Sequence, residues 1–233
     1  MSVSLQLEDI RKRIESARRS PRRPPQAGPV RLVCVTKGVA EDKVREAIAA
    51  GVLDVGESKV QEASSKRVRL AQAADSVSWH LIGHLQTNKA ARAVAIFDLI
   101  HSVDSSRLAR DINSKAGAAG KIQNVLIEVK ISGEDSKYGC SPKAAPALAK
   151  EIAGLKNLRL CGVMAMAPYF ADPEDARPYF ASARKVCEAI PESLAAPNPY
   201  SGVPVLSMGM SGDFEVAIEE GANMVRIGTS IFK

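Results

Sequence analysis

A lysine that ends an apolar run is the first residue of this sequence whose type and position suggest chemistry. In VCVTKGVA (33–40) the two valines alternate with Cys34 and Thr36, so Lys37 falls on the strand face of the valines. An ammonium group among apolar neighbours loses hydration, which lowers its pKa and favours the neutral amine. A neutral amine can attack an aldehyde and form a Schiff base. A lysine at a strand end can also extend its charged tip into water, so this stretch alone is consistent with both interpretations.

Two stretches near the C-terminus have the composition of an anion-binding cradle. LSMGMSGD (206–213) and MVRIGTSIF (224–232) each run from an apolar strand into a turn rich in glycine and hydroxyl groups. Glycines let backbone N–H groups approach an anion closely, and the loops after the last two strands of a barrel commonly bind phosphate. We expect Ser211 at the start of the following helix, and Gly228 and Thr229 directly after the last strand.

An arginine is the third feature predicted at this end of the sheet. Arg226 lies two residues before Gly228 and therefore on the same face of the predicted strand. The alternative is a set of tight turns beside a surface arginine. An amine, an anion cradle and an arginine that converge on one end of a sheet favour a ligand site.

These residues occupy strand ends in a regular alternation of apolar, β-branched runs with amphipathic segments of helical period. Such alternation predicts parallel strands joined by right-handed helical crossovers. About eight strands close an α/β fold of the (β/α)8 TIM-barrel type, whose usual size of ~250 residues suits the 233 residues here. An open doubly wound sheet would give the same alternation and is the alternative fold. Strands are expected at 30–37, 53–56, 78–82, 97–103, 123–131, 158–166, 203–208 and 223–228, and helices near 41–50, 58–73, 87–95, 105–116, 142–154, 173–189 and 213–220.

An additional helix is expected before the first strand. The chain stops just after the eighth strand with no room for a final helix, so we expect the N-terminal helix to pack on the barrel in its place. The prediction is a single domain over 1–233, with this helix and a basic linker over 1–29. Its apolar positions at helical spacing are Leu7, Ile10, Ile14 and Ala17.

The excess positive charge is concentrated at the N-terminus. Of the formal net charge of +6, residues 1–31 contribute 8 − 3 = +5, which leaves the rest of the chain almost neutral. A solvated helix face explains this charge, and a phosphate-binding arm is the alternative. Aromatic residues make up only 4% and no nucleic-acid-binding motif is present, so a nucleic-acid partner is disfavoured.

Signals for export, disulfides or metal binding are weak. The first twenty residues lack the apolar core of a secretory signal, and no stretch approaches the ~18 apolar residues that a membrane span requires. The cysteines are widely spaced and mostly lie in apolar runs, which favours reduced thiols of a cytoplasmic protein over disulfides. Zinc needs three or four converging ligands, so we expect no metal and interpret His80 as a packed or hydrogen-bonded ring. The cysteines are Cys34, Cys140, Cys161 and Cys187, and the histidines are His80, His84 and His101.

Specific stretches follow one another in a recognisable order. They are VTK (35–37), VGE (55–57), VQE (60–62), WHLIGHLQTNK (79–89), SGEDSKYG (132–139), GVMAM (162–166), LSMGMSGD (206–213) and MVRIGTSIF (224–232). In these stretches the sequence resembles the pyridoxal phosphate homeostasis proteins, also called the YggS/PROSC family. The resemblance implies a single barrel related to that of bacterial alanine racemases, with pyridoxal 5′-phosphate as the cofactor.

The resemblance also implies roles for individual residues. Lys37 matches the lysine that forms a Schiff base with the cofactor. Ser211, Gly228 and Thr229 match the phosphate-binding positions, with Met210 beside them. Arg226 matches the arginine that faces the pyridine nitrogen. A guanidinium donates to that nitrogen and keeps it unprotonated, which makes the ring a poorer electron sink.

Three residues depart from the family pattern. GESKVQE places Ser58 and Lys59 where the family usually has an asparagine and a tyrosine, and Lys130 replaces an asparagine at the end of the fifth strand. We expect all three near the mouth of the barrel, where they would alter contacts with the ring and add positive charge.

The resemblance implies a non-catalytic protein that binds pyridoxal phosphate in intracellular vitamin B6 homeostasis. Related racemases add a second domain and a tyrosine base, whereas this chain is all barrel, and an open site suits delivery better than proton abstraction. The expected partners are pyridoxal phosphate and apo-enzymes that depend on it, with no membrane, and we expect a monomer. The alternative is a fold-type III pyridoxal-phosphate-dependent amino-acid racemase or lyase. No family motif assigns a base role to Tyr138, Tyr169, Tyr179 or Tyr200.

Overall fold

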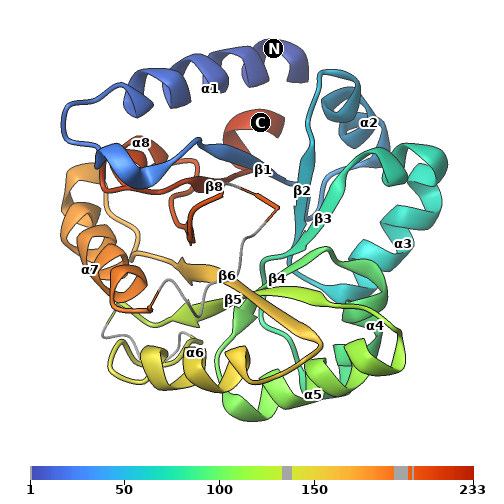
Figure 1. Cartoon of the computed structure of the whole chain (residues 1–233). Helices are drawn as coiled ribbons and strands as arrows, with labels where there is room; N and C mark the ends of the chain where they lie inside the picture. The colour runs from blue at the N-terminus through green and yellow to red at the C-terminus, as the bar shows by residue number, and fades with distance from the viewer. Residues whose placement is uncertain (1, 133–137, 192–198, 201) are drawn as a thin grey trace.

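The computed structural model describes residues 2–132, 138–191, 199–200 and 202–233. Its strands are all parallel and close into a barrel in chain order, with the first strand paired to the last (Figure 1). The closing register places Arg31 opposite Met224 and Cys34 opposite Ile227. This closure confirms the (β/α)8 barrel and excludes the open sheet. The strands are β1 Arg31–Val35, β2 Asp54–Glu57, β3 Ser78–Leu81, β4 Leu99–Val103, β5 Gln123–Val129, β6 Leu158–Ala165, β7 Val205–Ser207 and β8 Met224–Ile227.

Helices follow the strands and form an outer ring around the barrel (Figure 1). The helix expected over 58–73 ends at Leu70, because Ala71 adopts a φ of 50° and the chain continues as a 3-10 turn. The α-helices are α1 Val3–Arg18, α2 Glu41–Ala49, α3 Val60–Leu70, α4 Ala90–Ile96, α5 Ser106–Ala118, α6 Ala145–Ala153, α7 Arg177–Glu188, α8 Phe214–Glu219 and α9 Thr229–Phe232, and the 3-10 turns are η1 Pro25–Ala27, η2 Ala71–Ser76, η3 Thr87–Lys89 and η4 Pro173–Ala176.

The apolar side chains form two buried layers. The larger layer lies between the strands and the surrounding helices and contains Trp79, Phe97 and Phe180. A smaller cluster contains Val33, Leu126 and Met164. Burial of each large aliphatic or aromatic side chain contributes about 1.5–3 kcal/mol, so these two layers supply the main stabilisation of the barrel.

The N-terminal helix packs as the sequence predicts. Ser2 caps α1 by accepting from the N–H of Leu5, and Leu7 and Ile10 are buried against the barrel. The helix contacts α2, α8 and α9. The expectation that no helix follows the last strand is wrong, because α9 forms one turn after Gly228.

Several basic residues of the N-terminal segment hold the fold together. Arg11 Nη2 donates to the carbonyls of Ala50 and Gly51, both at 2.9 Å, at the end of α2. Arg23 is buried and its Nη1 donates to the carbonyls of Ile218 and Ala222 at 2.7 and 2.8 Å. Part of the positive charge at the N-terminus therefore has a structural role.

All four cysteines are free thiols, as expected for reduced core residues. Burial raises the pKa of Cys34 and of Cys161 to about 12, so neither thiol is ionised at neutral pH. Within the described ranges, no helix is both long and apolar enough to cross a lipid bilayer.

Candidate functional site

A cavity of about 930 Å³ lies at the C-terminal ends of the barrel strands. This is the end at which barrels of this type place their ligand sites, because the loops after the strands meet there. The structure brings all six residues of the predicted site to this cavity, from the segments after β1 and β7 and from β8 and its following turn. These residues are Lys37, Met210, Ser211, Arg226, Gly228 and Thr229.

Lys37 lies on the rim of the cavity. Val35 and Lys37 both line it, as the strand alternation predicts. Of the two interpretations of Lys37 that the sequence left open, the structure agrees with the one in which the charged tip reaches water, because β1 ends at Val35 and the chain turns at Gly38, which has a φ of 68°. Lys37 is therefore exposed. Among the described residues, no hydrogen bond or ion pair engages its ammonium group, so an entering ligand can reach it.

A buried ion pair holds the backbone directly before Lys37. Lys66, on α3, is 4% exposed, and its Nζ donates to the carbonyl of Thr36 and to Glu57 Oε1. The Thr36 hydroxyl also donates to Glu57 Oε1 at 2.7 Å. Sequence reasoning missed this cluster. The signal was an acidic residue, Glu57, at the end of an apolar strand.

Turns after the last two strands line the cavity where the sequence predicts the anion cradle. The hydroxyl of Ser211 accepts from the N–H groups of Gly228 and Ser230, both at 3.4 Å, and so joins the two turns. A Cβ atom on Gly228 would lie 2.9 Å from the carbonyl oxygen of Val35, so β1 and this turn approach too closely for any other residue. The cradle therefore depends on the glycine.

The position of Ser211 relative to the next helix differs from the prediction. Helix α8 begins at Phe214, so Ser211 lies in the preceding turn and not at the helix start. Asp213 closes this turn, because its Oδ1 accepts from the N–H of Met210 at 2.6 Å. Burial raises the pKa of Asp213.

Arg226 provides a buried cation that lines the cavity. Its Nη1 donates to Ser207 Oγ at 2.8 Å and its Nη2 to the carbonyl of Ala165 at 3.0 Å. Burial lowers the pKa of Arg226 to about 10, although the charges of Glu128 and Asp213 oppose that shift. The guanidinium therefore remains protonated at neutral pH.

Glu128, on β5, is a second buried ionisable group that sequence reasoning missed. It is 4% exposed, and its Oε2 has no hydrogen-bond partner among the described residues. Burial and the charge of Asp104 raise its pKa to about 7, and Arg226 acts in the opposite direction. Glu128 therefore titrates near neutral pH.

The residues that depart from the family pattern have different positions. Ser58 lines the cavity. Lys59, the residue before α3, does not line it, and its exposed Nζ pairs with Glu62 Oε1 at 2.9 Å. Lys130 is half-buried directly after β5 and is not among the described residues that line the cavity. Of these three residues, only Ser58 lines the cavity at the mouth of the barrel, where all three were expected.

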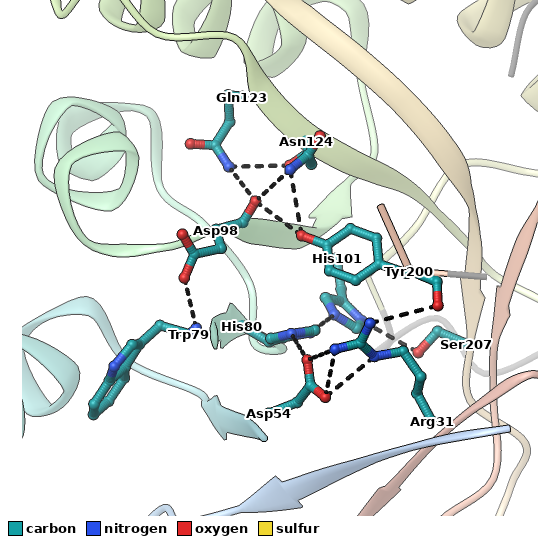
Figure 2. Close-up of polar contacts among 10 residues, drawn as sticks. All are labelled: Arg31, Asp54, Trp79, His80, Asp98, His101, Gln123, Asn124, Tyr200 and Ser207. Atoms are coloured by element: carbon teal, nitrogen blue, oxygen red, sulfur yellow. Dashed lines mark hydrogen bonds and ion pairs between the residues drawn. The ribbon is translucent and has the colours of Figure 1, made fainter. Parts of the chain in front are cut away.

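One tyrosine reaches the cavity although no motif indicated it. Tyr169 is 91% exposed and lines the rim. Tyr200 is buried and lies with Arg31 at the start of β1, the opposite end of the barrel (Figure 2).

The histidines do not form a metal site. Within the described residues, no group of three or more His, Cys, Asp or Glu side chains could hold a metal ion. His80 is fully buried and hydrogen-bonded to Asp54 and His101, as predicted for a core ring, and His84 stacks on Tyr138 with ring centroids 3.7 Å apart. Lys137, a further lysine in the SGEDSKYG stretch, lies outside the described residues.

Comparison with known proteins gives consistent matches along the chain. Residues 6–233 match the family described as alanine racemase, N-terminal domain. A protein of Aquifex aeolicus named pyridoxal phosphate homeostasis protein is 38% identical over 230 residues, covering 99% of this chain and 95% of the relative. A protein of the same name from Escherichia coli is 36% identical with the same coverage.

A solved structure agrees with these matches. PipY of Synechococcus elongatus, in a structure described as having PLP bound, is 32% identical with a TM-score of 0.82, and each chain covers 100% of the other.

Proposed function

Since this chain belongs to the pyridoxal phosphate homeostasis protein family, we propose that it binds pyridoxal 5′-phosphate, held by Lys37 as a Schiff base, without catalysing a reaction of its own. The observation that carries the proposal is the convergence of an amine, a hydroxyl-and-amide cradle and a buried guanidinium on one cavity. The bound group supplies an aldehyde, a phosphate and a ring nitrogen, which match these three features in charge and hydrogen bonding.

Each cavity residue then has a defined part in binding. The turns with Ser211, Gly228 and Thr229 receive the phosphate, and Met210 packs beside them. The requirement for glycine at position 228 supports this assignment, since it lets the turn pack directly against Val35 of β1 and keeps its backbone at the cavity wall beside Ser211. Arg226 donates toward the ring nitrogen from the buried side of the cavity.

Exposure of Lys37 favours a carrier over an enzyme. An amine on the rim is accessible to water and to other proteins, which suits uptake and delivery of an aldehyde. Proton abstraction needs a base held in a closed site. We propose that the protein acts in the cytoplasm as a monomer in vitamin B6 homeostasis, and that apo-enzymes receive its cofactor.

The alternative function is that of an amino-acid racemase or lyase of the same barrel type. An alanine racemase of Clostridium difficile shares this fold at a TM-score of 0.73 but only 13% identity. The feature that favours an enzyme is Tyr169 at the rim, since tyrosine can act as an acid–base group.

Exchange of the amino-acid α-proton in deuterated water distinguishes the two functions. We expect the loaded protein to exchange no faster than the free cofactor with any common amino acid. Saturable exchange above that rate, lost in both Lys37→Ala and Tyr169→Phe, would establish an enzyme and end the carrier proposal. Cofactor retention, measured separately by gel filtration, shows whether binding itself is intact in each variant.

A further inference from the structure

A continuous line of buried polar side chains runs through the barrel beneath the cavity. It begins at Arg226, whose Nη1 lies 2.8 Å from Ser207 Oγ. From Ser207 Oγ it passes to His101 Nδ1 at 3.2 Å, from His101 Nε2 to His80 Nδ1 at 3.0 Å, and from His80 Nε2 to Asp54 Oδ1 at 3.0 Å (Figure 2). Each of these residues is at most 4% exposed. We refer to Asp54, His80, His101 and Ser207 as the polar column.

The column joins the two ends of the barrel. Asp54 is the first residue of β2. Arg31, the first residue of β1, donates from Nη2 to Asp54 Oδ1 at 2.9 Å. Ser207 is the last residue of β7, next to the cavity. Members of β2, β3, β4 and β7 therefore contribute one side chain each, and an apolar residue at any of these positions would interrupt the line.

The ends of the column determine where its hydrogens lie. Arg226 only donates, so Ser207 Oγ accepts from it, and in the order that gives every donor its own acceptor Ser207 directs its hydrogen to His101 Nδ1. His101 then carries its hydrogen on Nε2 and donates to His80 Nδ1, and His80 donates from Nε2 to the carboxylate of Asp54. In this order every donor has one acceptor and both rings are neutral.

The charges around the column are consistent with this order. Burial would raise the pKa of Asp54, but the hydrogen bond from His80 and the ion pair with Arg31 outweigh it and lower that pKa. Burial lowers the pKa of His101 well below its usual value, and the charge of Arg226 acts in the same direction. The opposite hydrogen order would place an unprotonated His80 Nε2 against a carboxylate, which is unfavourable.

We propose that the polar column is a positioning device for Arg226, with His101 and His80 as positioning residues that fix the hydroxyl hydrogen of Ser207 away from the guanidinium. Ser207 Oγ and the carbonyl of Ala165 then hold two of the five N–H groups of Arg226 and leave the others for the cavity. This inference rests on the proposed function, because the group that Arg226 meets there is the ring of bound pyridoxal phosphate.

The hydrogen order can be measured without any cofactor. The chain has only three histidines, so long-range ¹H–¹⁵N spectra of the cofactor-free protein resolve each ring. We expect His80 and His101 at pH 7 to be neutral, with hydrogen on Nε2 and none on Nδ1. A doubly protonated ring, or hydrogen on Nδ1 of either one, would overturn the proposed order. This result does not depend on whether the protein binds pyridoxal phosphate.

The positioning role is tested by binding. His101→Phe keeps the ring volume but leaves the Ser207 hydroxyl without its acceptor, and we expect about a tenfold loss of affinity, the size of one hydrogen bond. The loss should be equal for pyridoxal phosphate and pyridoxal, since Arg226 meets the ring that both share, and the visible absorption maximum should shift. His101→Asn, which restores an acceptor near the place of Nδ1, should recover most of the affinity.

His84→Phe is the matched control, because His84 stacks on Tyr138 away from the column. Unchanged affinity and spectrum in a folded His101→Phe variant, or an equal effect of His84→Phe, would contradict the positioning role. If His101→Phe does not fold, the spectra of the unmodified protein decide the hydrogen order on which the role depends. Absence of pyridoxal phosphate binding by the unmodified protein would instead refute the proposed function.

Discussion

Lys37 and Arg226 line the same cavity but differ in exposure, and this difference separates their functions. Lys37 is exposed on a turn, whereas Arg226 is 4% exposed and held by two acceptors. An exposed amine is accessible to an aldehyde that diffuses in. A buried guanidinium held by two acceptors cannot reorient, so its remaining N–H groups keep one direction in the cavity.

Thr229→Ala should weaken phosphate recognition selectively. A hydrogen bond to a charged group contributes about 1.5–3 kcal/mol, so affinity for pyridoxal phosphate should fall by about one to two decades. Affinity for pyridoxal, which lacks the phosphate, should barely change. Fluorescence or absorbance titration with both ligands measures this, and Ser230→Ala, next along α9, is the matched control. Equal losses for both ligands would show that Thr229 does not bind phosphate.

Glu128→Gln should stabilise the protein more at high pH than at low pH. The pKa of Glu128 is raised from 4.5 to about 7 in the folded protein, so the folded state binds the proton more tightly than the unfolded state. Stability due to this group therefore falls as pH rises from about 4.5 to 7. Glutamine does not titrate and so removes that loss. The increase in the free energy of unfolding caused by Glu128→Gln should therefore be roughly 2–3 kcal/mol larger at pH 8 than at pH 5.

Urea unfolding at the two pH values measures this gain. Glu151→Gln, which changes an exposed glutamate paired with Arg110, provides the comparison. A pH-independent effect of Glu128→Gln would contradict a raised pKa for that carboxyl.

At the scale of elements, the sequence predicts strands better than it predicts turns and contacts between elements. The strands were predictable because each is a short segment bounded by turn residues and most are apolar, as in Arg31–Val35. The exposure of Lys37 was not fixed by the pattern, because it depends on the end of β1 at Val35 and on the turn at Gly38. The pair of Glu57 and Lys66 was not predictable either, since it depends on how α3 packs beside β2.

Lys66→Ala should destabilise the protein strongly. It leaves the Glu57 carboxylate, which is fully buried, without a cation, and such a loss costs about 3–5 kcal/mol. The double variant Glu57→Leu/Lys66→Met, which removes both charges and keeps volume, should recover much of that loss. Lys59→Ala breaks an exposed pair on the same helix and should have little effect. Equal stability of Lys66→Ala and Lys59→Ala in urea unfolding would contradict this account.

At the scale of the whole molecule, α1 completes the outer ring where α8 and α9 are short. It packs on both of these helices (Figure 1). Arg23 Nη1 donates to the carbonyls of Ile218 and Ala222 at the end of α8. Because β8 and its following turn carry Arg226, Gly228 and Thr229, the N-terminal helix supports the half of the cavity proposed to bind the phosphate.

Ile10→Ala should therefore destabilise the whole barrel. Ile10 is 1% exposed on α1, and truncation of a buried isoleucine costs about 2–5 kcal/mol. We expect a single unfolding transition at a lower denaturant concentration, observed equally by circular dichroism and by Trp79 fluorescence. Leu5→Ala, at a position 57% exposed on the same helix, is the control. A separate early transition for α1 would show that the helix does not support the barrel.

Reduction of the loaded protein with borohydride tests the central claim most directly, because it converts a Schiff base into a stable amine whose position peptide mass spectrometry identifies. The account predicts the cofactor mass on the peptide that contains Lys37, its loss in Lys37→Ala, and its retention in Lys43→Ala, since Lys43 lines the same cavity. Cofactor mass on Lys43 in the unmodified protein, or undiminished labelling of Lys37→Ala, would contradict it.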